Sequence, residues 1–280
     1  MLRREAPAKI NLCLEVTGTR PDGYHNLRSV MQTISIADTL EIRPANRDRL
    51  AVSVPALETP ENLVWRALEE IRHARPDNGG VEIALDKRIP VAAGLGGGSS
   101  DGASTLIALN DLWKTELSRS ILCNLAERLG SDVPFFLTGG TALIEGRGEI
   151  VEPLPSPPAV WYLLVKPPAG VSTARVFAEL RRDEWSDGHA AGNIAARIRA
   201  GNQPGFGPND LEPPLFRVSH EARACYDLVA SLRPEALIVS GSGPTVVGLF
   251  HTEARARDAA DRVPTELWAR VAMPYDRREE

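Results

Sequence analysis

A glycine-rich stretch at residues 94–98 is the feature that most restricts how this chain can fold. The alternating apolar pattern of residues 81–89 predicts a strand before it, and apolar residues at helical spacing from Ala103 to Leu109 predict a helix after it. A glycine-rich turn that leads into a helix presents unpaired backbone N–H groups at the positive end of the helix dipole. Such an arrangement binds phosphate groups.

Two other interpretations of this stretch have to be weighed. A tight turn without any ligand would have the same glycine content, so this alternative stays open on composition alone. Ser99, Ser100 and Asp101 are also residue types that cap helix N-termini, and that role can coexist with ligand binding. A Walker A loop is disfavoured, because no Gly-Lys-Ser/Thr sequence follows the glycines.

Length and charge narrow the class of protein. A chain of 280 residues favours two domains, since single hydrophobic cores usually stop growing near 100 to 200 residues. Its hydrophobic content of 43% and charged content of 25% are typical of a globular protein. The net charge of -5 disfavours nucleic acid as a partner, because nucleic-acid-binding proteins concentrate positive charge. A phosphate group in the ligand must therefore be bound by local groups.

The expected location is the cytoplasm. The N-terminal residues lack the apolar core of a signal peptide, and no run approaches the roughly 18 apolar residues of a membrane span. Cys13, Cys123 and Cys225 are odd in number and have no CxxC spacing, which disfavours a disulfide framework and a zinc site. We therefore expect no membrane partner, whereas the oligomeric state is left open by the sequence.

A proline-rich segment at residues 153–158 is the best candidate for a linker. Its prolines stiffen the chain and cannot continue a strand ladder. We therefore predict two domains, residues 1–155 and residues 156–280. The predicted strands are residues 8–16, 30–42, 81–89, 159–166, 236–239 and 245–250, and the clearest predicted helices are residues 62–73 and 117–129, the second ending before Gly130.

Short motifs elsewhere in the chain carry polar residues suited to chemistry. Taken singly, Lys9 on a strand would more often be a solvated or ion-paired residue, and Asp132 after a helix end would more often be a turn residue. The motifs are Pro7-Ala8-Lys9-Ile10-Asn11-Leu12, Arg20-Pro21-Asp22-Gly23-Tyr24-His25, Leu129-Gly130-Ser131-Asp132-Val133-Pro134, Gly146-Arg147-Gly148-Glu149, Asn209-Asp210-Leu211-Glu212 and Ser240-Gly241-Ser242-Gly243-Pro244.

Together these motifs resemble those of the GHMP kinases over nearly the whole chain. Residues 90–103 resemble the ATP-binding signature of that superfamily, Pro-x-x-x-Gly-Leu-Gly-x-x-Ser-Ser, and the run of three glycines is similar to the branch that phosphorylates a cytidine diphosphate-linked methylerythritol. The resemblance implies a two-domain α+β fold. The N-terminal domain would be similar to the second domain of the fifth small-subunit ribosomal protein, and the C-terminal domain would be ferredoxin-like.

The resemblance also implies a reaction and assigns roles to residues. ATP, with Mg²⁺, would phosphorylate the 2-hydroxyl group of the acceptor in isoprenoid precursor synthesis. Asp132 would accept the hydroxyl proton, and Lys9 would keep Asp132 ionised and stabilise the transferred charge. The implied ATP-binding residues are Pro90, Gly94, Leu95, Gly96, Gly97, Gly98, Ser99 and Ser100, the last also facing Mg²⁺. The implied acceptor-binding residues are Asn11, Tyr24, His25 and Phe177, with cytosine between an aromatic ring of the turn and Phe177.

Two alternatives remain beside this interpretation. A GHMP kinase for another small alcohol, such as mevalonate or homoserine, would have no base to stack, so Tyr24, His25 and Phe177 would lack a purpose in it. A catalytically silent nucleotide-binding module would be expected to have lost Lys9 or Asp132, and the sequence keeps both. A turnover assay separates the three.

Overall fold

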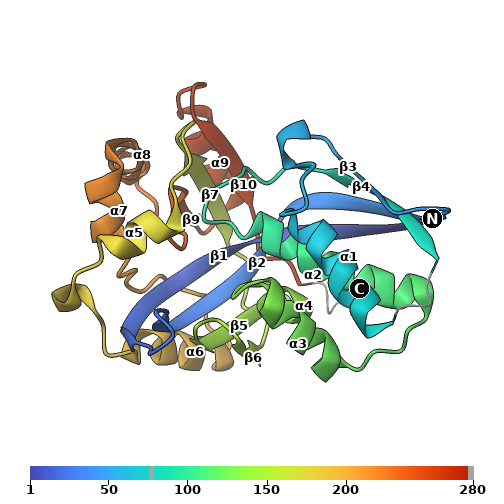
Figure 1. Ribbon diagram of the computed structural model, residues 1–280. Helices are drawn as coiled ribbons and strands as arrows, with labels where there is room; N and C mark the ends of the chain where they lie inside the picture. The colour runs from blue at the N-terminus through green and yellow to red at the C-terminus, as the bar shows by residue number, and fades with distance from the viewer. Residues whose placement is uncertain (76–78, 277–280) are drawn as a thin grey trace. The chain divides into compact units, whose positions relative to one another are not determined.

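The computed structural model describes residues 1–75 and 79–276, and these form two compact units, neither of which is a continuous stretch. The first unit comprises the described parts of Met1–Ala8, Ile36–Pro90 and Gly96–Thr138, and the second comprises Lys9–Ser35, Val91–Leu95 and the described residues from 139 onward. Strands β1 (Leu2–Thr19) and β2 (His25–Ala45) contribute residues to both units (Figure 1). A division of the chain near residue 155 therefore stays a prediction.

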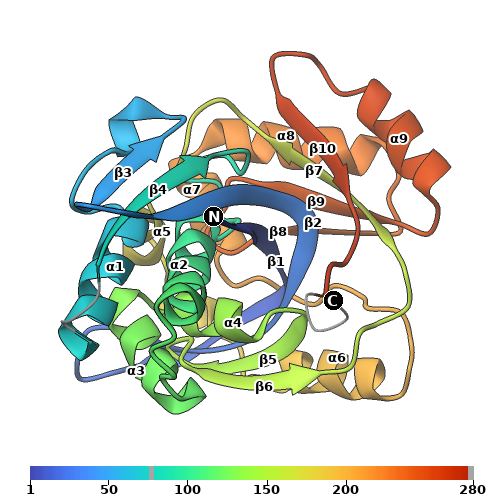
Figure 2. The same ribbon diagram turned by 90° about the vertical axis from the view of Figure 1, so that its right-hand side faces the viewer.

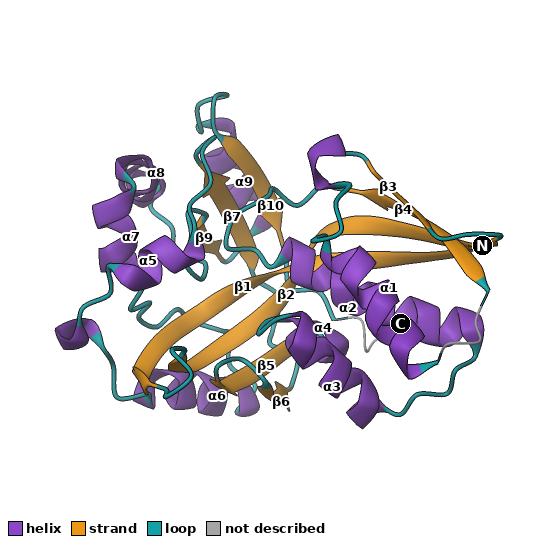
Figure 3. Ribbon diagram, in the orientation of Figure 1, coloured by secondary structure: helices purple, strands orange, loops and turns teal. Residues whose placement is uncertain are grey.

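The first unit combines sheet and helix. The second half of β2 pairs antiparallel with β4 (Gly80–Asp86), and β4 pairs in parallel with β3 (Arg49–Val52). Its helices contact one another, and Figure 3 shows them gathered as neighbours. They are α1 (Leu63–Ala74), α2 (Gly97–Trp113), α3 (Arg119–Leu129) and α4 (Val133–Thr138), with a short 3-10 turn at Pro55–Leu57.

Helix α1 follows directly from its sequence pattern. Val64, Ala67, Leu68 and Ile71 recur at helical spacing, and all four are buried. The side-chain oxygen of Asn62 accepts a hydrogen bond of 2.9 Å from the backbone N–H of Val64 and so caps the helix. The predicted helix at residues 62–73 is confirmed.

Helix α2 begins earlier than its polar residues suggest. Its N-cap is Gly96, whose φ of 68° lies in the left-handed region that glycine adopts without strain, and no side chain caps the helix. Ser99, Ser100 and Asp101 therefore lie within the first turns of the helix, and the expectation that they cap it is wrong. Ser100 and Asp101 are 0% and 2% exposed, so their polar atoms are buried where the helix begins.

In the second unit, the first half of β2 pairs antiparallel with β5 (Thr141–Gly146), and β5 pairs with β6 (Ile150–Leu154). Pro153 belongs to β6 and lies opposite Ala142, so the linker expected at residues 153–158 begins too early. The strand tolerates this proline because β6 is an edge strand, where a missing N–H costs no ladder hydrogen bond.

The second unit also contains an antiparallel sheet with the strand order β10-β7-β9-β8. This order, with helices after β7 and after β9, is ferredoxin-like, as expected. Helix α8 contacts β9 and helix α9 contacts β7. Figure 2 shows both helices beside this sheet. The elements are β7 (Trp161–Lys166), α5 (Thr173–Ala178), a 3-10 turn at Arg182–Glu184, α6 (His189–Arg199), α7 (Glu212–Val218), α8 (His220–Ser231), β8 (Ala236–Val239), β9 (Val246–Phe250), α9 (Glu253–Asp261) and β10 (Trp268–Ala272).

The core of this part consists of apolar side chains from the sheet and the helices over it. Leu163, Val165, Val246 and Phe250 are fully buried in one cluster, together with Val229 of α8. Each such side chain contributes about 1.5–3 kcal/mol relative to exposure. Over residues 1–75 and 79–276, no helix is both long and apolar enough to cross a membrane.

Candidate functional site

The glycine-rich stretch opens helix α2. Gly96 to Ser100 belong to the first unit, as does Pro90, whereas Gly94 and Leu95 belong to the second. The backbone N–H of Ser100 donates to the carbonyl oxygen of Gly96 at 2.9 Å, which is where the helical hydrogen bonding begins. As at every helix N-terminus, the preceding N–H groups of the first turn have no intrahelical acceptor, and such groups can bind an anion.

Two buried polar atoms lie at this helix start. Ser100 Oγ and Asp101 Oδ1 have no hydrogen-bond partner among the described residues. Buried polar atoms are nearly always paired, and hydroxyl and carboxylate oxygens are ligands that Mg²⁺ accepts, so these atoms fit the expected ion. The described part of the chain contains no group of three or more His, Cys, Asp or Glu that could hold a metal ion.

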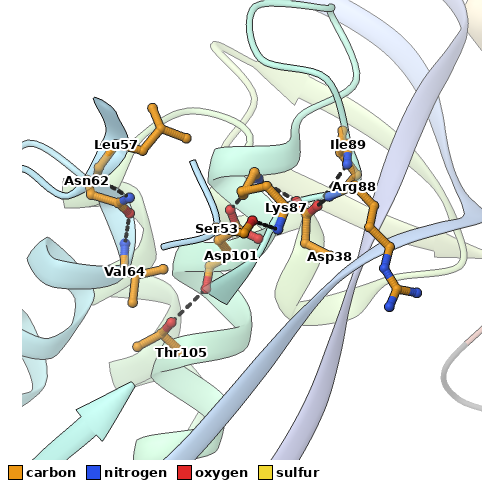
Figure 4. A network of polar contacts seen from close by, with 10 residues as sticks. All are labelled: Asp38, Ser53, Leu57, Asn62, Val64, Lys87, Arg88, Ile89, Asp101 and Thr105. Carbon is orange, nitrogen blue, oxygen red and sulfur yellow. Dashed lines mark hydrogen bonds and ion pairs between the residues drawn. The ribbon is translucent and has the colours of Figure 1, made fainter. Parts of the chain in front are cut away.

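A buried ionic network joins the loop to the sheet of the first unit (Figure 4). Lys87 Nζ donates to Asp38 Oδ2 and, at 2.6 Å, to Asp101 Oδ2. The other oxygen of Asp38 accepts the backbone N–H groups of Arg88 and Ile89. The three charged side chains are at most 5% exposed. The network thus connects β2, the residues that follow β4 and lead into the loop, and the N-terminal part of α2.

Burial determines how this network titrates. Desolvation raises the pKa of the Asp101 carboxyl to about 8, because it outweighs the attraction of the Lys87 ammonium. Burial by itself would lower the pKa of Lys87, but the charges of Asp101 and Asp38 outweigh it, and the pKa lies above its ordinary value. Lys87 therefore stays protonated at neutral pH.

Asp132 lies on the short connection between two helices of the first unit. Helix α3 ends with Gly130 as its C-cap, as predicted, and α4 begins at Val133, directly after Asp132. The side chain is partly buried. Lys9 belongs to the second unit, so the expected pairing of Asp132 with Lys9 stays a prediction.

Lys9 begins a chain of buried hydrogen bonds in the second unit. Its Nζ donates to Asn11 Oδ1 at 2.7 Å, and Asn11 Nδ2 donates to Ser29 Oγ at 2.8 Å. Ser29 Oγ donates in turn to the backbone carbonyl oxygen of Cys13 at 2.6 Å. Lys9 is 4% exposed, and Asn11 and Ser29 are 0% and 1% exposed. Two of the predicted site residues, Lys9 and Asn11, are therefore in direct contact.

The second glycine-rich turn, residues 240–244 between β8 and β9, contacts Gly94 of the same unit. Ser240 Oγ donates to the carbonyl oxygen of Gly94 at 2.9 Å. A Cβ atom at Gly94 would lie 2.2 Å from the carbonyl oxygen of Ser240, and the φ of Gly94 is +76°. Only glycine fits this position.

The backbone of the same turn lies beside Lys9 and Asn11. A Cβ atom at Gly241 would lie 3.3 Å from both Lys9 Nζ and Asn11 Oδ1. The side-chain amide of Asn209 holds this backbone by donating to the carbonyl oxygens of Val239 and Gly241, at 2.9 and 2.8 Å. Asn209 is a motif residue for which the sequence suggested no role, and the structure gives it this structural one.

The aromatic residues predicted to bind a base all belong to the second unit. The ring of His25 stacks on that of Phe177, with centroids 5.1 Å apart and planes at 28°, and Trp185 lies edge-on to His25 at 6.1 Å. Tyr24 is 52% exposed and lies under the guanidinium group of Arg147, 5.4 Å from its ring centroid. Among the described residues, the ring of Phe177 therefore stacks on His25, and the guanidinium group of Arg147 covers one face of the Tyr24 ring.

The turn that carries these rings forms as predicted. The Gly23 N–H donates to the carbonyl oxygen of Arg20 at 3.1 Å, and Gly23 has a φ of +83°. Desolvation lowers the pKa of the His25 imidazole below its ordinary value. A neutral imidazole offers one N–H donor and one nitrogen acceptor at neutral pH.

Several residues of this site were not found by sequence reasoning. Asp38 and Lys87 form the network below the loop, and Ser29 completes the chain from Lys9. The available signal was weak: Asp38 is a charged residue inside a predicted apolar strand, and Ser29 directly precedes that strand. Neither position reveals its partner, because the partners are distant in the sequence.

Comparison with known proteins gives family matches over most of the chain. The family model described as GHMP kinases N terminal domain matches residues 62–140, and that of GHMP kinases C terminal matches residues 186–269. The chain is 44% identical over 263 residues to a 4-diphosphocytidyl-2-C-methyl-D-erythritol kinase of Pelotomaculum thermopropionicum, and the match covers 92% of each protein.

Solved structures also match this chain. A crystal structure of 4-(cytidine 5'-diphospho)-2C-methyl-D-erythritol kinase matches with a TM-score of 0.83 and 36% identity, covering 98% of this chain and 100% of that one. Homoserine kinase from Cytophaga hutchinsonii matches with a TM-score of 0.71 and 16% identity, covering 98% and 94% of the two chains. At that identity the likeness extends to the fold alone.

Proposed function

Because this chain belongs to the 4-diphosphocytidyl-2-C-methyl-D-erythritol kinases, a family of GHMP kinases, we propose that it transfers the γ-phosphoryl group of ATP to the 2-hydroxyl group of 4-diphosphocytidyl-2-C-methyl-D-erythritol. The products are ADP and the 2-phosphate of the acceptor, an intermediate of the non-mevalonate isoprenoid pathway. In this transfer the bond from the acceptor oxygen to the γ-phosphorus forms, and the bond between that phosphorus and the β,γ-bridging oxygen breaks.

Asp132 and Lys9 carry the chemistry in this proposal. The Asp132 carboxylate accepts the proton of the 2-hydroxyl group, and the Lys9 ammonium stabilises the negative charge of the transferred group. The fixed geometry of Lys9 supports its role, because its Nζ donates to Asn11 in a nearly fully buried setting and needs little reorganisation.

The glycine-rich stretch from Gly94 to Ser100, with Pro90 before it, binds the triphosphate of ATP. The free N–H groups at the start of α2 suit this role, and Gly97 and Gly98 carry no side chains that would keep phosphate away. Ser100 Oγ would hold Mg²⁺, which supplies positive charge that screens the phosphates and favours the transfer.

The acceptor is bound through its cytosine and its hydroxyl groups. Tyr24, His25 and Phe177 supply aromatic surface for the base, and the backbone of the turn together with the neutral imidazole of His25 supplies donors and acceptors for its edge. Asn11 lies beside Lys9 and is placed to contact the acceptor near the reacting hydroxyl. We place the reaction in the cytoplasm, a location supported by the three free cysteines.

The aromatic cluster around His25 is the observation that carries the choice of acceptor. Mevalonate and homoserine lack a base, so kinases for these alcohols gain nothing from a stacked His25 and Phe177. The test measures ADP formation with ATP and Mg²⁺ and, in separate reactions, the cytidyl acceptor, mevalonate and homoserine. We expect ADP with the cytidyl acceptor alone. Robust phosphorylation of mevalonate or homoserine without turnover of the cytidyl acceptor would overturn the proposal, and no turnover with any acceptor would indicate a silent nucleotide-binding module.

A further inference from the structure

The hydrogen-bond chain that ends on Lys9 has a direction, and that direction starts from the backbone. The carbonyl oxygen of Cys13 can only accept a hydrogen bond, so the hydroxyl group of Ser29, 2.6 Å away, must donate to it. A serine hydroxyl has one proton. With that proton directed to Cys13, Ser29 Oγ can only accept from Asn11, which lies 2.8 Å away.

This constraint decides which way the amide group of Asn11 points. The amide NH₂ group must face Ser29, so the amide oxygen must face Lys9, whose Nζ lies 2.7 Å from it. The reverse orientation would place the NH₂ group against the Lys9 ammonium, which has only donors, and would turn the amide oxygen toward a hydroxyl group whose proton is already in use. All three side chains are at most 4% exposed, so water does not compensate such a mismatch.

We propose that Ser29 is a positioning residue of this kinase, which acts through Asn11 to hold the ammonium group of Lys9 in its working orientation. The inference rests on the proposed function of Lys9. The backbone of Gly241 lies on the same two groups, where a Cβ atom would come within 3.3 Å of Lys9 Nζ and of Asn11 Oδ1. Asn11 therefore holds Lys9 in a close-packed setting, and a change in the orientation of the Asn11 amide would move the ammonium group of Lys9.

The same strand provides a matched control. Gln32 of β2 also lies in a buried relay, in which Tyr162 donates to Gln32 Oε1 at 2.6 Å and Gln32 Nε2 donates to Thr141 Oγ1 at 2.9 Å. Gln32 and Thr141 are 1% and 2% exposed, which matches the burial of Asn11 and Ser29. These two hydrogen bonds involve no charged group, so Thr141→Val removes a buried hydroxyl group of the same kind without touching the Lys9 chain.

The test compares Ser29→Ala with Thr141→Val, each in the full chain and each combined with Lys9→Met. We expect Ser29→Ala to lower kcat by about 10- to 10²-fold, the scale of a misplaced catalytic group, with the KM for ATP changed less than about twofold. In the Lys9→Met background, the Ser29→Ala change should lower kcat no further, because nothing is left to position. Thr141→Val should leave kcat within about twofold in both backgrounds. Equal kcat for Ser29→Ala and Thr141→Val, or losses from Ser29→Ala and Lys9→Met that multiply, would overturn the inference.

A second measurement keeps the inference testable without turnover and without a folded Ser29 variant. In ¹⁵N-labelled protein, the side-chain amide resonance of Asn11, assigned by its loss in Asn11→Asp, should exchange slowly with solvent and should remain protected in Lys9→Met. This is expected because the NH₂ group faces Ser29 and not Lys9. Rapid exchange in the unchanged protein would overturn the inference. A protein that fails to phosphorylate the cytidyl acceptor but shows a protected Asn11 amide would fail the proposed function alone.

Discussion

The imidazole ring of His25 lies on the ring of Phe177, with centroids 5.1 Å apart and an interplanar angle of 28°. Stacking by itself accepts every base, because each base has a π-face, and it provides about 1–3 kcal/mol of affinity without selection. Selection of a base must come from hydrogen bonds to its edge. The backbone of the turn and the imidazole of His25 can together present a donor and an acceptor to that edge, so affinity and selection have separate sources here.

We predict that the protein discriminates cytosine from uracil. Cytosine presents an N4 donor beside an N3 acceptor, and uracil reverses both. A donor and acceptor that match cytosine would therefore face like groups of uracil, and each buried mismatch would cost roughly 1–3 kcal/mol. The uridyl analogue of the acceptor should have a kcat/KM lower by at least about 10²-fold. Phe177→Ala should weaken both substrates alike by loss of stacking. Comparable kcat/KM for the two substrates in the unchanged protein would show that the base edge is not recognised.

The discrimination should depend on pH in a defined direction. Burial lowers the pKa of His25, so the imidazole stays neutral as the pH falls past its ordinary value of about 6.5 and gains a proton only below it. Protonation converts its acceptor nitrogen into a donor. The ratio of kcat/KM for the cytidyl and uridyl substrates should therefore be constant from pH 8 to about pH 6.5 and change below that. Ionisations that affect both substrates cancel in this ratio. A ratio that changes between pH 7 and 8 would contradict the assignment to His25.

The roles of Asp132 and Lys9 predict a coupled loss of activity. Asp132→Asn should lower kcat by about 10² to 10⁴, the usual scale of general-base assistance, with little change in ATP affinity. Lys9→Met should lower kcat by a similar factor. The double variant should lose much less than the product of the two single losses, since both residues act in the same transfer step. Single-turnover kinetics and ATP titrations separate the two effects. Losses that multiply would mean that the residues act independently.

The network around Lys87 predicts a large effect on stability. Lys87→Met removes the cation beside the buried carboxylate of Asp38 and the hydrogen-bond donor to the buried carboxyl of Asp101, and should cost about 3–5 kcal/mol of unfolding free energy. Arg88→Met is the control, because Arg88 pairs with Asp86 at 3.1 Å in an exposed setting, where such pairs contribute about 0–1 kcal/mol. Urea unfolding at neutral pH measures both. Similar losses for the two variants would show that the buried network contributes no more to the stability of the protein than an exposed ion pair.

The contact between Ser240 and Gly94 predicts a difference between two glycine substitutions. Gly94 and Gly139 have similar φ angles of +76° and +67°, so alanine at either position incurs roughly 1–2 kcal/mol of backbone strain. A Cβ atom at Gly139 meets nothing within 4 Å, whereas one at Gly94 would lie 2.2 Å from the carbonyl oxygen of Ser240. Gly94→Ala should therefore destabilise the protein by about 1–3 kcal/mol more than Gly139→Ala, the scale of overpacking. Thermal unfolding of both variants checks this, and equal melting temperatures would refute it.

Several elements followed from local sequence alone. Helix α1 was predicted because apolar residues recur at helical spacing after the cap Asn62, and helix α3 because Gly130 ends it. The turn at Gly23 and the helix after the glycine-rich stretch depend on residue types whose preferences act over a few residues. The order of motifs along the chain was also sufficient to identify the GHMP kinases, since that resemblance requires no knowledge of contacts.

Other features were decided by the tertiary structure. Pro153 looked like part of a linker, yet it lies in β6 because an edge strand tolerates a missing N–H, and edge position depends on the neighbouring strands. Ser29 is joined to Asn11, and Asn209 to Gly241, by hydrogen bonds between residues 18 and 32 positions apart in the chain. Local preferences act over a few residues and cannot specify such partners. Residue types and motif order therefore determined which groups this protein uses, whereas packing between distant segments decided how Lys9 and its neighbours are held.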